Sequence, residues 1–162
     1  SVGLSADGQL ALTGSADKSA HLWDTKTGET IHSFSHKSRV NHVTISDDGR
    51  LGLTLDAIEA HTIWNLTTGD EISTLDTHLR FFEFNHARFS KDNRLLLAGL
   101  PKRKLQLWRV SDGVKLAEWY AHQQRARASV LSVAFGKDGQ VISENSDGML
   151  EIWPMPQTNT QR

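Results

Sequence analysis

The amino-acid sequence predicts an all-β protein made of four similar repeats, and three observations support this. Tryptophans recur at nearly constant spacing, with intervals of 41, 44 and 45 residues between Trp23, Trp64, Trp108 and Trp153. An aspartate stands 16 residues before each of the first three tryptophans and 15 residues before the fourth. Apolar and polar residues alternate on both sides of these aspartates, as they do in half-buried strands.

The length of the repeat predicts the architecture. Units of about 40–45 residues with four strands each are typical of the blades of a β-propeller. We predict four such blades at approximately residues 1–34, 35–75, 76–119 and 120–154, followed by a polar tail over 155–162. No segment shows the spacing of an amphipathic helix.

Each blade is predicted to begin with two strands joined by a tight turn at the aspartate. In the last three repeats, apolar residues stand three, five and eight positions before the aspartate, which predicts the first strand. Glycine accepts the positive φ that tight turns require, and asparagine tolerates it better than most residues. The turn pairs are Asp7-Gly8, Asp48-Gly49, Asp92-Asn93 and Asp138-Gly139.

The third strand of each blade is predicted to end on the tryptophan, and a fourth strand to follow a glycine five residues later. The predicted third strands are 20–23, 60–64, 104–108 and 149–153. The predicted fourth strands are 30–34, 71–75 and 114–119. After Trp153 the sequence continues as Pro154-Met155-Pro156, so no outer strand is predicted for the last blade.

The segment Gly14–Asp24 reads Gly-Ser-Ala-Asp-Lys-Ser-Ala-His-Leu-Trp-Asp and resembles the end of a WD repeat, including its Trp-Asp pair. The other repeats have Asn65, Arg109 and Pro154 in place of that aspartate. The resemblance covers residues 2–154. Within the family, the chain is similar to the diverged WD-repeat proteins of bacteria. It implies a non-enzymatic protein-interaction scaffold with no cofactor, whose partner binds the rim loops.

The resemblance also implies that four side chains brace each blade through hydrogen bonds: a histidine, a Ser or Thr, a turn aspartate and the tryptophan. The second and third repeats depart from this pattern, because Ile58 and Lys102 stand at the aspartate position and Ala98 at the hydroxyl position. A structural role is favoured over a catalytic one, since a buried indole or imidazole N–H needs a partner. The first and fourth repeats supply Thr13, Asp17, Trp23, His122, Ser143, Asp147 and Trp153.

Rings of WD repeats commonly close when an N-terminal segment adds the outer strand of the last blade. The resemblance therefore implies that these four blades are an arc of a ring of about seven or eight, within the usual range of about 4–8. The remaining blades would come from the same chain or from another. A two-chain ring and a self-closed ring of four blades are alternatives, and a size measurement would separate them.

Composition and motifs narrow the function classes. The net charge is −1 and 23% of residues are charged, which does not indicate a polyanion binder overall. The chain has no cysteine, so disulfide and thiolate chemistry are excluded, while the cytoplasm and the periplasm both remain compatible. No nucleophile elbow, phosphate-binding glycine loop or paired Cys/His metal motif is present. His42 and His86 share one repeat position, and we predict that they line the central channel without a ligand or metal.

A set of basic residues is the candidate partner-binding surface. Three precede the third tryptophan strand and the others stand in loops that lead into the second, third and fourth blades. Clustered cations steer acidic partners, whereas nucleic acid is disfavoured because no aromatic residues are interleaved for stacking. The alternative function is an enzyme or a cofactor-binding propeller with its site at the mouth of the channel. The rim candidates are Lys102, Arg103, Lys104, Arg125, Arg127, Lys37, Arg39 and Arg80.

Overall fold

The computed structural model describes residues 1–58, 61–77, 84–122 and 128–156. It contains four antiparallel sheets that follow one another along the chain, in which neighbouring strands are consecutive in sequence. The prediction of an all-β fold with four WD-type blades is confirmed. Among the described residues no helix has the length and apolar character needed to cross a membrane.

The first three blades have four strands each. Blade 1 contains β1 (Val2–Leu4), β2 (Leu10–Gly14), β3 (Ser19–Asp24) and β4 (Thr30–Ser35). Blade 2 contains β5 (Val40–Ile45), β6 (Leu51–Asp56), β7 (His61–Asn65) and β8 (Glu71–Thr74). Blade 3 contains β9 (His86–Phe89), β10 (Leu95–Gly99), β11 (Lys104–Arg109) and β12 (Lys115–Tyr120).

The fourth blade has three strands within the described residues, as predicted. They are β13 (Val130–Phe135), β14 (Val141–Asn145) and β15 (Leu150–Trp153). A 3-10 turn, η1 (Lys137–Gly139), joins β13 to β14 where the sequence predicts only a tight turn.

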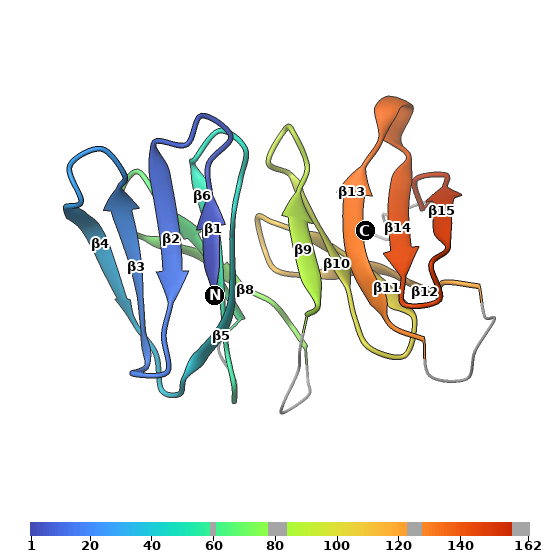
Figure 1. Ribbon diagram of the computed structural model, residues 1–162, viewed down its shortest axis with the longest axis horizontal. Helices are drawn as coiled ribbons and strands as arrows, with labels where there is room; N and C mark the ends of the chain where they lie inside the picture. The colour runs from blue at the N-terminus through green and yellow to red at the C-terminus, as the bar shows by residue number, and fades with distance from the viewer. Residues whose placement is uncertain (59–60, 78–83, 123–127, 157–162) are drawn as a thin grey trace.

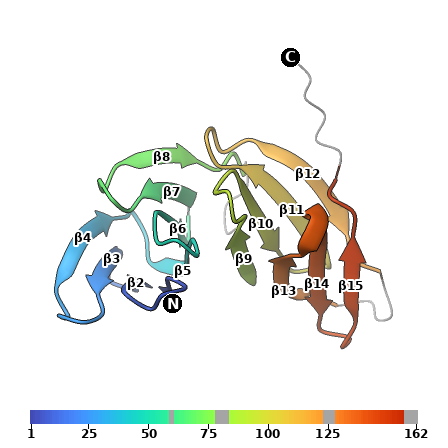
Figure 2. The same ribbon diagram turned by 90° about the horizontal axis from the view of Figure 1, so that it is seen from above.

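The four sheets form an open arc (Figure 2). The first strands of the blades, β1, β5, β9 and β13, lie on its concave side, and each contacts the next along the arc. The outer strands β4, β8 and β12 lie on the convex side. Figure 1 shows the strands running between two rims, so the loops of every blade open on one rim or the other.

Most third strands run one residue beyond the tryptophan, because the next residue forms the following turn. The Asp24 carboxylate accepts the N–H groups of Lys26 and Thr27, at 2.8 and 2.9 Å. The Asn65 amide oxygen repeats this arrangement in blade 2. Pro154 stands at this position in blade 4 and has no N–H to donate, and there the strand ends on Trp153.

The hydrophobic core lies between blades, in three layers. In the first layer, Leu12 and Leu22 of blade 1 pack with Val43 and Ile45 of blade 2, and Trp64 covers its edge. The second and third layers join blade 2 to blade 3 and blade 3 to blade 4 in the same way. Removal of this apolar surface from water is the main favourable contribution to the fold, and it makes each blade depend on its neighbour.

The junctions between blades are of two kinds. A Cβ atom at Gly14 would lie 2.6 Å from a Val40 methyl and 2.8 Å from a Val43 methyl, so this glycine lets the valines of blade 2 pack closely. Gly99 has the same relation to Val130 and Val133 of blade 4. At the equivalent position in the middle junction stands Leu55, and it packs in one cluster with Ala87. Leucine in place of the glycine is thus matched by alanine in place of the second valine, while Phe84 takes the place of the first valine in the same cluster.

The two end faces of the arc are apolar and exposed. Val2 and Leu4 of blade 1 are 66% and 61% exposed, and Leu150 and Ile152 of blade 4 are 67% and 60% exposed. Side chains at the corresponding positions of the internal junctions, such as Ile45 and Leu22, are buried. Exposed apolar surface of this kind is typical of interaction sites.

Candidate functional site

The tryptophan of three blades donates its indole N–H to a hydroxyl on the neighbouring strand. Trp23 donates to Thr13 at 2.8 Å, Trp64 to Thr54 at 2.7 Å and Trp153 to Ser143 at 3.0 Å. The two residues of each pair stand diagonally across the second and third strands of their blade. Each bond satisfies an indole N–H that sits at the edge of the packed sheet.

The second blade contains a buried polar group around a carboxylate on β6. The Asp56 and His36 side chains are 0% and 1% exposed, with His36 Nδ1 4.0 Å from Asp56 Oδ2. The His36 ring meets the Trp64 ring edge-on. His61 lies beside them and its Nδ1 is 2.9 Å from the Thr77 hydroxyl. Burial lowers the pKa of both His36 and His61, while the nearby Asp56 carboxylate opposes this shift.

In the fourth blade the histidine is paired with a strand residue. The His122 ring stacks on Trp153 with 5.2 Å between centroids, and its Nδ1 contacts the Glu151 carboxylate. The same carboxylate accepts the His122 backbone N–H at 2.9 Å. Asp147 lies in the turn after β14, where its N–H donates to Asn145. In blade 1, Asp17 accepts the Ser19 hydroxyl and backbone N–H.

The sequence predicts that the carboxylates of these groups stand in turns, but Asp56 and Glu151 stand on strands and are not among the predicted residues. Asp56 lies two residues before Ile58, the position expected to carry the aspartate of blade 2. Glu151 lies two residues before Trp153 on the same strand and therefore on the same face of the sheet. This spacing of two residues from the tryptophan is the sequence signal that points to Glu151.

The third blade lacks the hydroxyl partner of its tryptophan. Trp108 is 1% exposed and its indole N–H has no hydrogen-bond partner among the described residues. Ala98 stands where the other blades have Thr13, Thr54 and Ser143. A buried donor without an acceptor costs about 1–3 kcal/mol.

We therefore expect Ala98→Ser to stabilise the protein by about 1 kcal/mol, because the new hydroxyl can accept the Trp108 N–H. Thermal unfolding should show a rise of about 2–4 °C for a chain of this size. Ala20→Ser is the matched control, since Ala20 is equally buried in a blade whose tryptophan already has its acceptor. A lower unfolding temperature for Ala98→Ser than for the unmodified chain would contradict this assignment.

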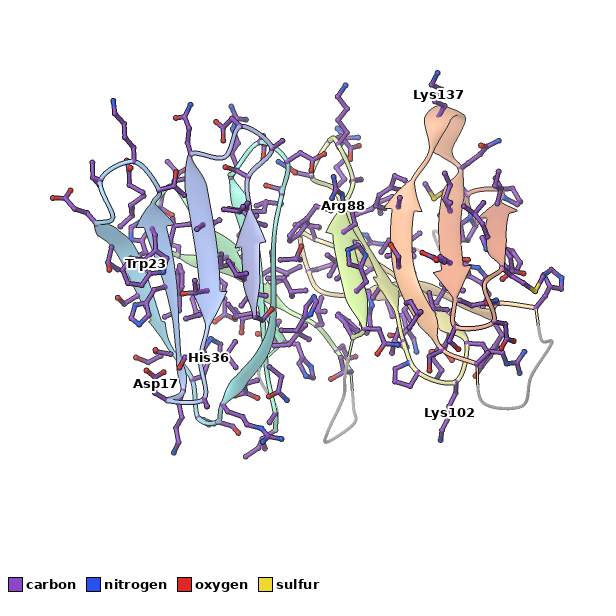
Figure 3. The ribbon with its side chains drawn as sticks, viewed as in Figure 1. Asp17, Trp23, His36, Arg88, Lys102 and Lys137 are labelled. Carbon is purple, nitrogen blue, oxygen red and sulfur yellow. The ribbon has the colours of Figure 1, made fainter. Side chains whose placement is uncertain are left out.

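The rim candidates differ in how freely they can bind a partner. Figure 3 places Asp17, His36 and Lys102 toward one rim, hereafter the Lys102 rim, and Lys137 on the opposite rim, the Lys137 rim. Lys37, Arg39 and Lys102 are all exposed, and Lys37 and Arg39 flank the half-buried Ser38 in the loop after β4. Arg80, Arg125 and Arg127 lie outside the described residues.

Arg103 and Lys104 are held by neighbouring groups of blade 3. The Arg103 guanidinium donates to the Ala121 carbonyl at 3.0 Å. Lys104 Nζ lies 3.1 Å from a Glu118 carboxylate oxygen, and Lys115 binds the other oxygen at 2.9 Å. Burial of Glu118 disfavours its ionised form, but hydrogen bonds from Gln106, Lys115 and Lys104 outweigh this and lower the pKa of Glu118 to about 2. Lys104 therefore braces the sheet.

His42 and His86 lie on the concave side of the arc, where both line a small recess with Arg88 and Asp47. Burial, together with the neighbouring His86, lowers the pKa of His42 to about 4. Burial also lowers the pKa of His86, and the Arg88 guanidinium adds to the shift. Among the described residues no group of three or more His, Cys, Asp or Glu side chains is arranged to hold a metal ion.

These blades, their tryptophan–hydroxyl pairs and their inter-blade cores define a class of protein: a partial β-propeller of WD-type blades. The chain carries a WD repeat, since the family described as WD domain, G-beta repeat matches residues 1–24. A search of the curated proteins found no match.

Comparison with solved structures supports the same fold. In the comparison with solved structures, 1225 chains match this protein. One is the crystal structure of the computationally designed Ika4 protein, with a TM-score of 0.67 and 21% sequence identity over 96% of this chain and 89% of that chain. At this level of identity the likeness concerns the fold.

Proposed function

We propose that the chain is a non-enzymatic protein-interaction scaffold that binds an acidic segment of a partner at the Lys102 rim. The observation that carries this proposal is the turn at Lys102. Lys102 and Arg103 both adopt left-handed backbone conformations, with φ of 59° and 64°. The Leu100 N–H donates to the Lys104 carbonyl at 2.9 Å across this turn. An exposed ammonium on a hydrogen-bonded turn of a rigid sheet is a suitable anchor for a carboxylate.

The loop after β4 supplies two further cations to the same rim. Lys37 directly follows His36, whose side chain is buried beside Asp56, and Arg39 stands three residues after His36. The backbone of this loop is held at both ends, because the His36 N–H donates to the Lys18 carbonyl and the Ala57 N–H donates to the Arg39 carbonyl. We propose Arg80, Arg125 and Arg127 as further members of the surface. Lys104 is left out because it pairs with Glu118.

A charge-reversal experiment tests the rim. The probe is a fluorescent peptide of ten glutamates, titrated by anisotropy at low ionic strength. Replacing Lys37, Arg39 and Lys102 together with glutamate should weaken binding at least about tenfold, because a few exposed charges contribute up to about 1 kcal/mol each. The matched control reverses Lys26, Arg50 and Lys137, which are exposed and change the net charge by the same amount.

An equal loss in both triple variants would show that net charge and not the Lys102 rim governs binding, and the proposal would be abandoned. Addition of salt should weaken the binding of the unmodified chain, since exposed charges are screened over about 8 Å at physiological ionic strength.

We also propose that the exposed apolar end faces are covered by further blades, from the same or another chain. The support is positional. Ile152 directly precedes Trp153, as Leu22 precedes Trp23, and Leu22 is buried against the next blade. Val2 and Leu4 stand five and three residues before the turn aspartate, as Val43 and Ile45 do in blade 2. Each end face therefore carries one half of the pattern that forms the internal junctions.

A further inference from the structure

The concave side of the arc carries a recess of about 570 Å³ that is separate from the Lys102 rim. It lies between the inner strands of blades 3 and 4 and extends to the turn between β9 and β10. Its polar lining residues are Asp47, His86, Arg88, Lys91 and Ser132. In Figure 3 Arg88 lies toward the Lys137 rim. Recesses of about 300–1,000 Å³ are the size that small-molecule ligands occupy.

The protonation of His86 is set by the neighbouring blade. The Val133 N–H on β13 donates to His86 Nδ1 at 3.2 Å. A neutral imidazole has one donor and one acceptor nitrogen, so the ring proton must be on Nε2. Burial and the adjacent Arg88 lower the pKa of His86, which keeps the ring neutral near pH 7. The donor that His86 can offer to a ligand is therefore Nε2–H, and His86 is one of the residues that line the recess.

Arg88 and Lys91 give the recess a positive charge. Arg88 Nη2 donates to Asp47 Oδ1 at 2.8 Å, and the Arg88 side chain is 50% exposed. A guanidinium has five N–H donors, so this ion pair leaves others available to a ligand. Lys91 is exposed in the turn that follows β9. Two cations and one carboxylate leave a net positive charge on the lining, with Phe89 and Phe135 as apolar neighbours.

We propose that this recess binds a small organic oxyanion whose carboxylate or phosphate oxygens are held by Arg88, Lys91 and the Nε2–H of His86. The lining favours an anion because its three nitrogen side chains are all donors, and a guanidinium matches the geometry of both oxyanions. The Ser132 hydroxyl adds a fourth polar group. Asp47 competes with the ligand for Arg88. This inference is independent of the scaffold function, because it uses other residues on another part of the arc.

The test titrates the chain separately with sodium phosphate and sodium citrate at constant ionic strength, with chloride as the balancing anion. Calorimetry reads the affinity, and nitrogen-15 NMR reads the His86 ring. We expect saturable one-to-one binding and a rise in the pKa of His86 when its Nε2–H meets the anion. Arg88→Gln should weaken binding at least about tenfold and Lys91→Gln several-fold. Asp47→Asn should strengthen it, because the competing carboxylate is removed.

The matched control is Arg50→Gln. Arg50 is 77% exposed in the corresponding turn of blade 2, and its replacement removes the same charge outside the recess. Saturation with either anion supports the proposal. The anion with the higher affinity shows whether the recess prefers a phosphate or a carboxylate. The absence of saturable binding of both anions, or an equal loss in Arg50→Gln and Arg88→Gln, would overturn it. Lys91→Gln keeps the test valid if Arg88→Gln does not fold, because Lys91 is exposed.

Discussion

Replacement of Gly113 with alanine is expected to lower the free energy of unfolding by about 3 kcal/mol. Gly113 has a φ of +68°, and a Cβ atom there would lie 2.1 Å from the Thr74 carbonyl oxygen. A left-handed conformation costs an L-residue about 1–2 kcal/mol, and overpacking adds about 1–3 kcal/mol. The obstructing atom belongs to the backbone of blade 2, and the adjacent Asp76 N–H donates to the Gly113 carbonyl at 3.1 Å. The two backbone segments therefore cannot separate without loss of this bond.

Gly28→Ala is the matched control for this prediction. Gly28 stands at the same point of the repeat with a φ of +74°, and a Cβ atom there would have no neighbour within 4 Å. This variant should lose only the conformational cost of about 1–2 kcal/mol. Urea unfolding of both variants measures the difference between their free energies of unfolding. In thermal unfolding, each kcal/mol corresponds to a shift of about 2–4 °C in the midpoint. Equal costs would show that blades 2 and 3 separate easily at this turn.

Acidification from pH 7 to pH 4 is expected to destabilise the fold through its buried histidines. The pKa values of His36, His42, His61 and His86 are all lowered in the folded chain, mainly by burial. The unfolded chain then binds protons first, so stability is complete above about pH 6.5 and is lost as pH falls toward each folded pKa. For His42 the shift from 6.5 to about 4 sets an upper limit of about 3 kcal/mol.

Urea midpoints at a series of pH values from neutral to acid test this, and His42→Gln should flatten the curve between pH 6.5 and about 4. Carboxylates affect the stability at lower pH than the histidines do. The pKa of Glu118 is about 2, and hydrogen bonds from Ser5 and Ser90 lower the pKa values of Asp7 and Asp92. A midpoint that stays constant down to about pH 5 would contradict the role assigned to the histidines.

The blades and their strands could be predicted from the sequence because the local residue pattern of each repeat determines where its strands and turns form. Turn pairs such as Asp48-Gly49 and the alternation before them depend only on residues a few positions apart. The hydroxyl partner of Trp23 is similarly local, since Thr13 is ten residues away on the adjacent strand.

The polar contacts of the candidate sites could not be predicted in this way, because they join residues that only the fold brings together. His86 and Val133 are 47 residues apart, and His122 and Glu151 are 29 residues apart. The basic run predicts Lys104 at the rim, but its side chain reaches across the sheet to Glu118 on β12. Pairings of this kind depend on strand register, which composition and spacing do not give.

The exchange of small and large residues at the junctions has a consequence for how such a chain can grow or shrink. Loss of blade 3 alone would set Leu55 against Val133, which is too bulky, and loss of blade 2 alone would set Gly14 against Phe84 and Ala87 in place of two valines, so neither junction would keep its packing. Loss of blades 2 and 3 together would set Gly14 against Val133, the combination of Gly99 with Val133. We therefore expect a pair of blades to be the smallest unit that can be duplicated or deleted without compensating core mutations.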